Sequence, residues 1–374
     1  MVKERPHTVF DVCQKLFPTA YERQLMLTMS ETIGQLDYLE ANGYVTKKQE
    51  AGRYVYEAVG GVGVRLKGRH VVITGASGGI GEQIAYEAAR QGAVPVLLAR
   101  SEERLKEISA RIEAQTGIRA PYASLDVSDR GMIEAVVSQL IADLGAIDVL
   151  VNNAGFGVFR YVEDIDLDEM ERMFAVNVFG LIACTKAVYS HMKERGSGHI
   201  INIASQAGKI ATPKSSVYSA TKHAVVGFTD SLRLEAGRFG IFVTAVNPGP
   251  VETNFFSTAD ESGEYVRNVS RWMLRPEAVA KRVVAAMMTP TREVNMPRWM
   301  DLGSRLYRLA PSLVENGGEA GVFTKSKSKK LVENGHVVSS IIVLRLLWNA
   351  RGCPELVGHP FTIAAPLFFL IRGI

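Results

Sequence analysis

The chain has 374 residues, 47% of them hydrophobic and 22% charged, which excludes a disordered or fibrous protein. The formal net charge of +4 is small for this length and does not indicate a nucleic-acid or membrane partner. Three widely spaced cysteines predict neither a disulfide framework nor a metal site. Met1–Pro6 is charged and lacks the apolar core of a signal peptide, so we expect a cytoplasmic protein.

Residues 1–63 are predicted to form a small module that ends in the flexible linker Gly60–Gly63. Ser30 can cap a helix that stops at Asn42 and Gly43. Two short strands around a polar turn follow, at Tyr44–Val45 and Arg53–Tyr56. Helices followed by such a ribbon indicate a winged-helix-like module.

This module has two further interpretations. Its segment Leu36–Val45 is similar to the small C-terminal module of some metallo-β-lactamase-fold proteins. Alternatively, the module could read DNA while the rest of the chain serves as a redox sensor. The predicted helix carries Glu31, Asp37 and Glu40 but no Lys or Arg, whereas DNA affinity depends on neutralising phosphates. We therefore expect no nucleic-acid partner and a structural or dimerisation role.

Residues 64–324 are predicted to form one larger domain, in which apolar strand-like runs alternate with segments of helical periodicity. This alternation is typical of an α/β fold with a parallel sheet covered on both faces. The predicted strands are His70–Thr74, Val94–Ala99, Val149–Val151, His199–Ala204 and Phe242–Val246. The predicted helices are Gly81–Arg90, Glu102–Glu113, Arg130–Leu144 and Leu167–Lys193. Such a doubly wound sheet binds ligands beyond the carboxyl ends of its strands.

A glycine-rich turn joins the first predicted strand to the first helix of this domain. Its spacing is Gly-x-x-x-Gly-x-Gly, from Gly75 to Gly81. Glycines let the backbone approach a pyrophosphate, and the following helix N-terminus offers unpaired N–H groups. The alternative is a turn that serves only tight packing. The predicted phosphate-binding residues are Gly75, Ser77, Gly78, Gly79, Ile80 and Gly81.

The end of the second strand predicts which dinucleotide binds. In NAD-binding folds, a carboxylate about 20 residues beyond the glycines accepts hydrogen bonds from the ribose. Here Arg100 and Ser101 occupy that place, and both can bind a 2′-phosphate. The sequence therefore predicts NADP(H), unless Arg100 is only a solvated surface charge.

Tyr218 and Lys222 are four residues apart, a spacing that puts both on one face of a helix. A tyrosine ordinarily loses its proton near pH 10, about three units above neutrality. A neighbouring ammonium should lower this pKa toward the range useful for acid–base catalysis. Ser205 follows a predicted strand, where its hydroxyl could hold a substrate oxygen. Asn177 lies in mid-helix, where asparagine has poor propensity and needs another reason to occur.

Taken in order, these motifs resemble the short-chain dehydrogenase/reductase family over about Lys67–Pro297. The resemblance implies a doubly wound Rossmann fold, with Tyr218 as the acid/base, Lys222 as its pKa modulator and ribose anchor, Ser205 as the substrate orienter and Asn177 as support for a proton relay. It also implies further cofactor contacts, although Asp126 could simply be a turn residue. These are Asp126, Val127, Asn153, Ala154, Gly155, Tyr218, Lys222, Pro248, Gly249, Val251 and Thr253.

The predicted function is NADP(H)-dependent interconversion of a carbonyl compound and an alcohol, with a non-catalytic cofactor-binding sensor or scaffold as the alternative. Aromatic and methionine side chains in Glu252–Arg275 suit a lid over an apolar substrate, or equally plain packing. The family resemblance implies a homodimer or homotetramer. Residues 325–374 are unassigned: their apolar runs, Val337–Trp348 and Phe361–Ile371, are shorter than the roughly 20 residues of a spanning helix.

Overall fold

The computed structural model describes residues 7–18, 25–41, 45–50, 52–58, 65–260 and 263–309. The linker Gly60–Gly63, the predicted boundary at residue 324 and the apolar runs of the tail lie outside the described residues.

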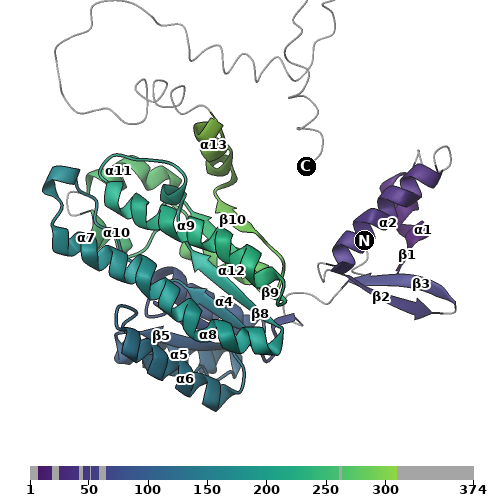
Figure 1. The fold of residues 1–374 in the computed structure, drawn as a ribbon, viewed down its shortest axis with the longest axis horizontal. Helices are drawn as coiled ribbons and strands as arrows, with labels where there is room; N and C mark the ends of the chain where they lie inside the picture. Colours follow the sequence, from purple (N-terminus) through teal and green to yellow (C-terminus); the bar gives the residue numbers. More distant parts are fainter. Residues whose placement is uncertain are drawn as a thin grey trace, which may run out of the picture. The chain divides into compact units, whose positions relative to one another are not determined.

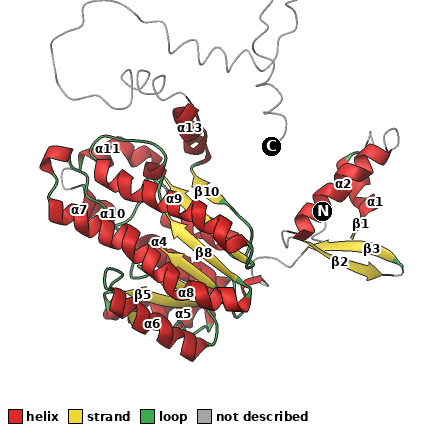
Figure 2. Ribbon diagram, viewed as in Figure 1, coloured by secondary structure: helices red, strands yellow, loops and turns green. Residues whose placement is uncertain are grey.

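A seven-stranded parallel sheet forms the centre of the domain that begins at residue 65 (Figures 1 and 2). Its strand order is β10-β9-β8-β7-β4-β5-β6. The chain therefore reverses its winding direction between β4 and β7, the point at which doubly wound sheets open a ligand crevice. The strands are β4 (His70–Thr74), β5 (Val94–Ala99), β6 (Tyr122–Ser124), β7 (Val149–Asn152), β8 (Gly198–Ile203), β9 (Ile241–Pro248) and β10 (Glu293–Met296).

Helices cover both faces of the sheet because alternate strand residues point to opposite sides. Val71 and Ile73 of β4 belong to one buried cluster with α4, α5 and α12. Val72 belongs to a second cluster with α6, α8 and α9. These helices are α4 (Gly79–Arg90), α5 (Glu102–Thr116), α6 (Arg130–Leu144), α8 (Leu181–Arg195), α9 (Ser216–Gly237) and α12 (Pro276–Ala286).

The predicted doubly wound fold is confirmed, and each of the five predicted strands has ends within two residues of the expected positions. The predicted helix Leu167–Lys193 consists of α7 (Leu167–Phe174), a π-helical turn η2 (Ala175–Gly180) and α8. This continuous helix is long and apolar enough to cross a membrane by length and composition. Its buried residues Leu181, Val188 and Met192 instead pack in the domain core.

The N-terminal module has its own small core. Its elements are β1 (His7–Thr8), α1 (Val9–Leu16), α2 (Leu25–Ala41), β2 (Val45–Glu50) and β3 (Arg53–Ala58). The strands form an antiparallel sheet in the order β1-β3-β2. Side chains from both helices and the sheet are buried together, namely Val12, Leu36, Val45 and Tyr56.

The prediction that Ser30 caps the second helix is wrong, because α2 already begins at Leu25. Threonine hydroxyls are satisfied inside this helix: Thr28 Oγ1 donates to the Leu25 carbonyl at 3.2 Å, and Thr32 Oγ1 donates to the Thr28 carbonyl at 2.7 Å. Polar side chains that bond back to the preceding turn are compatible with a helix interior. Ser30 therefore lies within the helix, and the expected stop at Asn42 is outside the described residues.

Candidate active site

The glycine-rich turn after β4 has no room for a side chain at Gly75 or at Gly81. Gly75 and Gly79 have φ angles of 66° and 56°, which glycine adopts most readily. A Cβ atom at Gly81 would lie 2.4 Å from the carbonyl oxygen of Gly75. The backbone at the start of α4 is therefore bare, and its unpaired N–H groups favour an anionic phosphate.

Asn153 holds this turn against the loop after β7. Its Nδ2 donates to the carbonyl oxygens of Thr74 and Gly75, at 3.0 Å each. Thr74 Oγ1 accepts from the backbone N–H of Asn153 at 3.0 Å and from that of Ala154 at 3.1 Å. Asn153 and Ala154 thus shape the turn, a contribution that the sequence did not reveal.

The other predicted cofactor residues lie along the carboxyl edge of the sheet. A Cβ atom on Gly79 would be 3.2 Å from Thr253 Cγ2, so the turn after β4 and the loop after β9 meet. Glycines at the start of α4 let a pyrophosphate approach the backbone, so the residues present fit a dinucleotide. The residues are Ser77, Gly78 and Ile80 after β4, Arg100 and Ser101 after β5, Asp126 and Val127 after β6, Gly155 after β7, and Pro248, Gly249, Val251 and Thr253 at the end of β9.

The carboxylate of Asp126 is occupied within its own turn. It accepts hydrogen bonds from the Ser128 hydroxyl at 2.6 Å and from the Ser128 backbone N–H at 2.9 Å. These bonds, with a smaller contribution from the Arg100 cation, hold the pKa of Asp126 below its usual value. Arg100 itself is exposed at the end of β5.

The predicted catalytic side chains come together beside the end of β8. Tyr218 and Lys222 share one side of α9 and are only 9% and 6% exposed. Lys222 Nζ lies 5.7 Å from the centroid of the Tyr218 ring and donates to the Ile203 carbonyl at 3.0 Å. Ser205 Oγ accepts from the Ala207 backbone N–H at 3.1 Å and lies 3.5 Å from the Pro248 carbonyl.

Asn177 lies in the π-helical turn, where it joins two segments of the site. Its Nδ2 donates to the Phe156 carbonyl at 2.8 Å and to Thr221 Oγ1 at 3.2 Å, while its Oδ1 accepts from the Phe156 N–H at 3.0 Å. π-Helical turns are frequent at functional sites because they redirect one side chain. Asn177 therefore fixes the loop after β7 to α9, and Thr221 is a partner that the sequence did not suggest.

Burial dominates the protonation of the catalytic pair. It raises the pKa of the Tyr218 phenol above its ordinary value; hydrogen bonding to Ser205 opposes this shift, and nearby Tyr265 adds to it. Burial also lowers the pKa of Lys222 to about 8. The net shift of the Tyr218 pKa is therefore upward, opposite to the predicted lowering, because desolvation of the phenolate is its largest cause; Lys222 instead donates to the Ile203 carbonyl.

Aromatic side chains surround the Tyr218 ring. The segment predicted as a lid contains α10 (Phe255–Ala259), α11 (Glu264–Val269) and η4 (Ser270–Trp272). Phe159, which follows β7, lies at the centre of these aromatic rings, which we call the aromatic cluster. Its ring centroid is 5.6 Å from Tyr218 and 4.6 Å from Tyr265, and its N–H donates to the Ala259 carbonyl at 2.8 Å. Phe255 packs 5.7 Å from Tyr218, so apolar rings close over the phenol.

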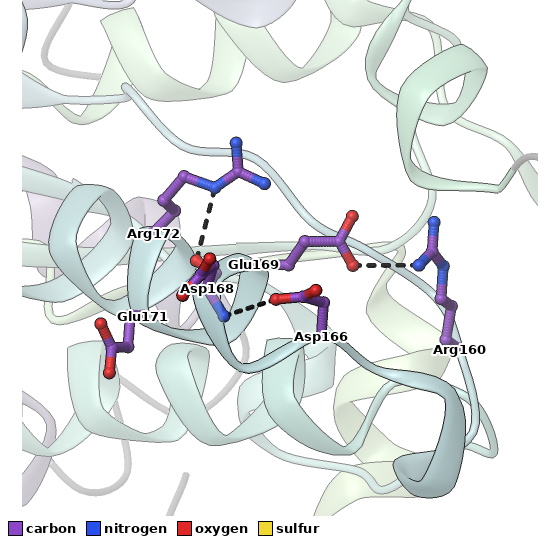
Figure 3. Close-up of a pocket in the computed structure, with 6 residues that line it drawn as sticks. All are labelled: Arg160, Asp166, Asp168, Glu169, Glu171 and Arg172. Atoms are coloured by element: carbon purple, nitrogen blue, oxygen red, sulfur yellow. Dashed lines mark hydrogen bonds and ion pairs between the residues drawn. The ribbon is translucent and has the colours of Figure 1, made fainter.

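An open pocket of about 570 Å³ borders α7, and its lining is charged (Figure 3). Arg160 pairs with Glu169 at 3.1 Å, and Arg172 Nε donates to the Asp168 carbonyl at 3.4 Å. No predicted site residue lines this pocket, whose residues are Arg160, Asp166, Asp168, Glu169, Glu171 and Arg172. We therefore place the candidate active site at the carboxyl edge of the sheet.

Comparison with known proteins agrees with this placement. Residues 69–263 match the family model described as short chain dehydrogenase. An uncharacterised oxidoreductase of Staphylococcus epidermidis is 35% identical over 227 residues, which cover 61% of this chain and 94% of the relative. The chain therefore belongs to the short-chain dehydrogenase/reductase family, and the predicted family and Rossmann fold are confirmed.

Solved structures of this fold point more narrowly to an oxidoreductase that uses a nicotinamide cofactor. A gluconate 5-dehydrogenase from Burkholderia cenocepacia, in complex with NADP and tartrate, has a TM-score of 0.59 and 28% identity, covering 63% of this chain and 96% of its own. A 3-ketoacyl-(acyl-carrier-protein) reductase from Brucella melitensis, complexed with NADH, has a TM-score of 0.56 and 29% identity, covering 62% and 97%.

Proposed function

We propose that this protein is an NADP(H)-dependent oxidoreductase that interconverts a ketone or aldehyde with the corresponding alcohol. The observation that carries the proposal is the burial of the Tyr218 phenol beside Ser205, with Lys222 one helical turn away and bonded to the end of β8. This group lies at the same edge of the sheet as the bare glycine turn, where a doubly wound fold binds its ligands.

In this proposal the nicotinamide cofactor supplies or accepts the hydride, and the protein handles the proton. The Ser205 hydroxyl orients the substrate oxygen. Because burial raises the pKa of Tyr218, the phenol keeps its proton at neutral pH and donates it to the carbonyl oxygen during reduction. Lys222, with a pKa of about 8, can return a proton to the site and anchors the cofactor ribose. The neutral phenol is the form that donates a proton during reduction, whereas oxidation requires the phenolate as the acceptor.

A panel of aldehydes and ketones tests the reaction class directly. We expect NADPH consumption, followed at 340 nm, with at least one apolar aromatic ketone or diketone. NADPH binding without turnover across the whole panel would instead support the non-catalytic scaffold.

Arg100 is proposed to select NADPH by pairing with the 2′-phosphate. The relatives do not settle this choice, since one neighbour binds NADP and another NADH. We expect Arg100→Asp to shift the ratio of kcat/KM for NADPH over NADH by about 100-fold toward NADH, because it replaces attraction of the phosphate by repulsion. Lys106→Asp, an equal charge change at an exposed position of α5, is the matched control. An unchanged ratio would make Arg100 a surface charge.

The aromatic cluster is proposed to select apolar substrates and to limit their size. A Cβ atom on Gly157 would lie 2.8 Å from Phe255 Cζ and 2.9 Å from Tyr218 Cδ2, so little space remains beside the phenol. We expect Phe255→Ala to raise kcat/KM for bulky aryl ketones about tenfold relative to small aldehydes, because it removes a ring above Tyr218. Phe242→Ala removes a ring at the opposite end of β9 and should leave this ratio unchanged.

A further inference from the structure

Lys209 is a buried cation four residues beyond Ser205 that the proposed mechanism does not use. It is only 6% exposed. Its Nζ lies 2.5 Å from Glu293 Oε2, 3.0 Å from Asn295 Oδ1 and 3.5 Å from Asp301 Oδ1. Burying an ammonium is costly unless it is paired and hydrogen-bonded. These four residues, the Lys209 cluster, satisfy that condition.

The Lys209 cluster connects the two loops that border the reaction. Asn295 Oδ1 accepts a second hydrogen bond, from Asn247 Nδ2 at 2.9 Å. The Asn247 carbonyl accepts from Gln206 Nε2 at 2.9 Å. Gln206 and Asn247 are both buried, and they adjoin Ser205 and Pro248 in the chain. The loop after β8 and the end of β9 are therefore both tied to one oxygen atom of β10.

A backbone contact strengthens this connection on the β10 side. Asn295 and Met296 are in register with Asn247 and Pro248. The N–H of Gly249 donates to the Met296 carbonyl at 2.6 Å. Any shift of β10 would therefore move the Pro248–Gly249 loop relative to Ser205.

We propose that Lys209 is a positioning residue that sets the distance between Ser205 and the Pro248–Gly249 loop through Asn295. The proposal rests on the proposed function, in which Ser205 holds the substrate oxygen, and on the predicted contact of Pro248 and Gly249 with the cofactor. Hydride transfer depends steeply on the alignment of donor and acceptor, and a misplacement of about 1 Å can cost a factor of about 100 in rate. Without the ammonium, the loop after β8 loses its ion pairs to Glu293 of β10 and to Asp301 of α13 (Arg298–Leu309), so both elements are released from that loop.

Lys209→Met is the primary test. We expect kcat to fall about tenfold with phenanthrenequinone, an apolar aromatic diketone, as the substrate. The Kd for NADPH, measured by the fluorescence of the bound cofactor, should change less than threefold, because the phosphate turn lies elsewhere. Lys209→Arg keeps the cation and should recover most of the lost kcat. A folded Lys209→Met protein with kcat within twofold of the parent overturns the proposal.

Arg195→Met is the control that distinguishes a loss of positioning from a general loss of stability. It removes a guanidinium 3.0 Å from Asp148, a carboxylate that is only 4% exposed and lies before β7, at the opposite end of the sheet. Both variants should lower Tm, whereas only Lys209→Met should lower kcat. A loss of kcat in Arg195→Met equal to that in Lys209→Met would overturn the proposal.

Asn295→Ala provides a second route if Lys209→Met does not fold. It keeps the Lys209–Glu293 pair and removes the shared acceptor, so we expect a similar loss of kcat, and an unchanged kcat would overturn the proposal. Tyr218→Phe is measured in parallel. Full turnover in Tyr218→Phe would refute the proton-donating role of Tyr218, and the absence of NADPH consumption by the parent protein would refute the proposed function itself. An inactive Tyr218→Phe beside a fully active Asn295→Ala would refute only the role of Lys209.

Discussion

Tyr218→Phe is expected to lower kcat about 1000-fold while leaving the Kd for NADPH within about threefold of the parent value, because positioned general acids contribute roughly 100- to 10,000-fold. The substitution removes one oxygen atom and keeps the ring that packs edge-on against Phe159 and near Phe255. Steady-state NADPH consumption measures the first quantity, and fluorescence titration measures the second.

The control for this variant is Tyr86→Phe. Tyr86 is also a largely buried phenol, but it lies in α4 and donates to Glu82 Oε1 at 3.2 Å. Loss of the Tyr86 hydroxyl should lower the stability of the protein and leave kcat unchanged. If Tyr218→Phe retained more than a tenth of the parent kcat, another group would have to supply the proton, and the proposed mechanism would fail.

Much of the catalytic domain could be predicted because the motifs concerned consist of residues that are close together in the chain. The glycine turn, the strand before it and the helix after it are adjacent in the chain, so their spacing specifies the local structure directly. Tyr218 and Lys222 share a side of α9 because helical geometry places residues four apart together. The sequence therefore predicted the fold and predicted that Ser205, Tyr218 and Lys222 lie close together.

The features that the sequence did not predict join segments far apart in the chain. Phe159 and Ala259 are 100 positions apart, yet one hydrogen bond connects them. The bond from Lys209 to Asn295 spans 86 positions, and β10 itself was not predicted. No periodicity or local motif marks such pairs, because tertiary packing alone creates them.

The error in the pKa of Tyr218 has the same origin. Sequence spacing reveals a neighbouring lysine but not how deeply both groups are buried. In the folded domain the aromatic cluster excludes water from the phenol, so its neutral form is favoured. The wrong prediction that Ser30 caps a helix has a different cause. Several residues before Ser30 can also begin a helix, and local propensity does not determine which of them does.

Gly81→Ala is expected to weaken NADPH binding at least tenfold and to lower Tm, although it adds only one methyl group. The added Cβ would lie 2.4 Å from the Gly75 carbonyl oxygen and 2.5 Å from Asn153 Nδ2. Neither atom can easily move, because Asn153 Nδ2 already donates to the Thr74 and Gly75 carbonyls. The turn must open to accept the methyl group, which misaligns the N–H groups at the start of α4 that favour a phosphate.

Gly227→Ala is the matched control, because a Cβ atom at that position in α9 would meet nothing within 4 Å. Alanine is favoured over glycine by about 1 kcal/mol in a helix interior, so this variant should keep or raise Tm and bind NADPH normally. Fluorescence titration and thermal unfolding compare the two variants. Normal NADPH affinity in Gly81→Ala would show that the cofactor phosphates bind elsewhere, since a distorted turn cannot hold the pyrophosphate as the parent turn does.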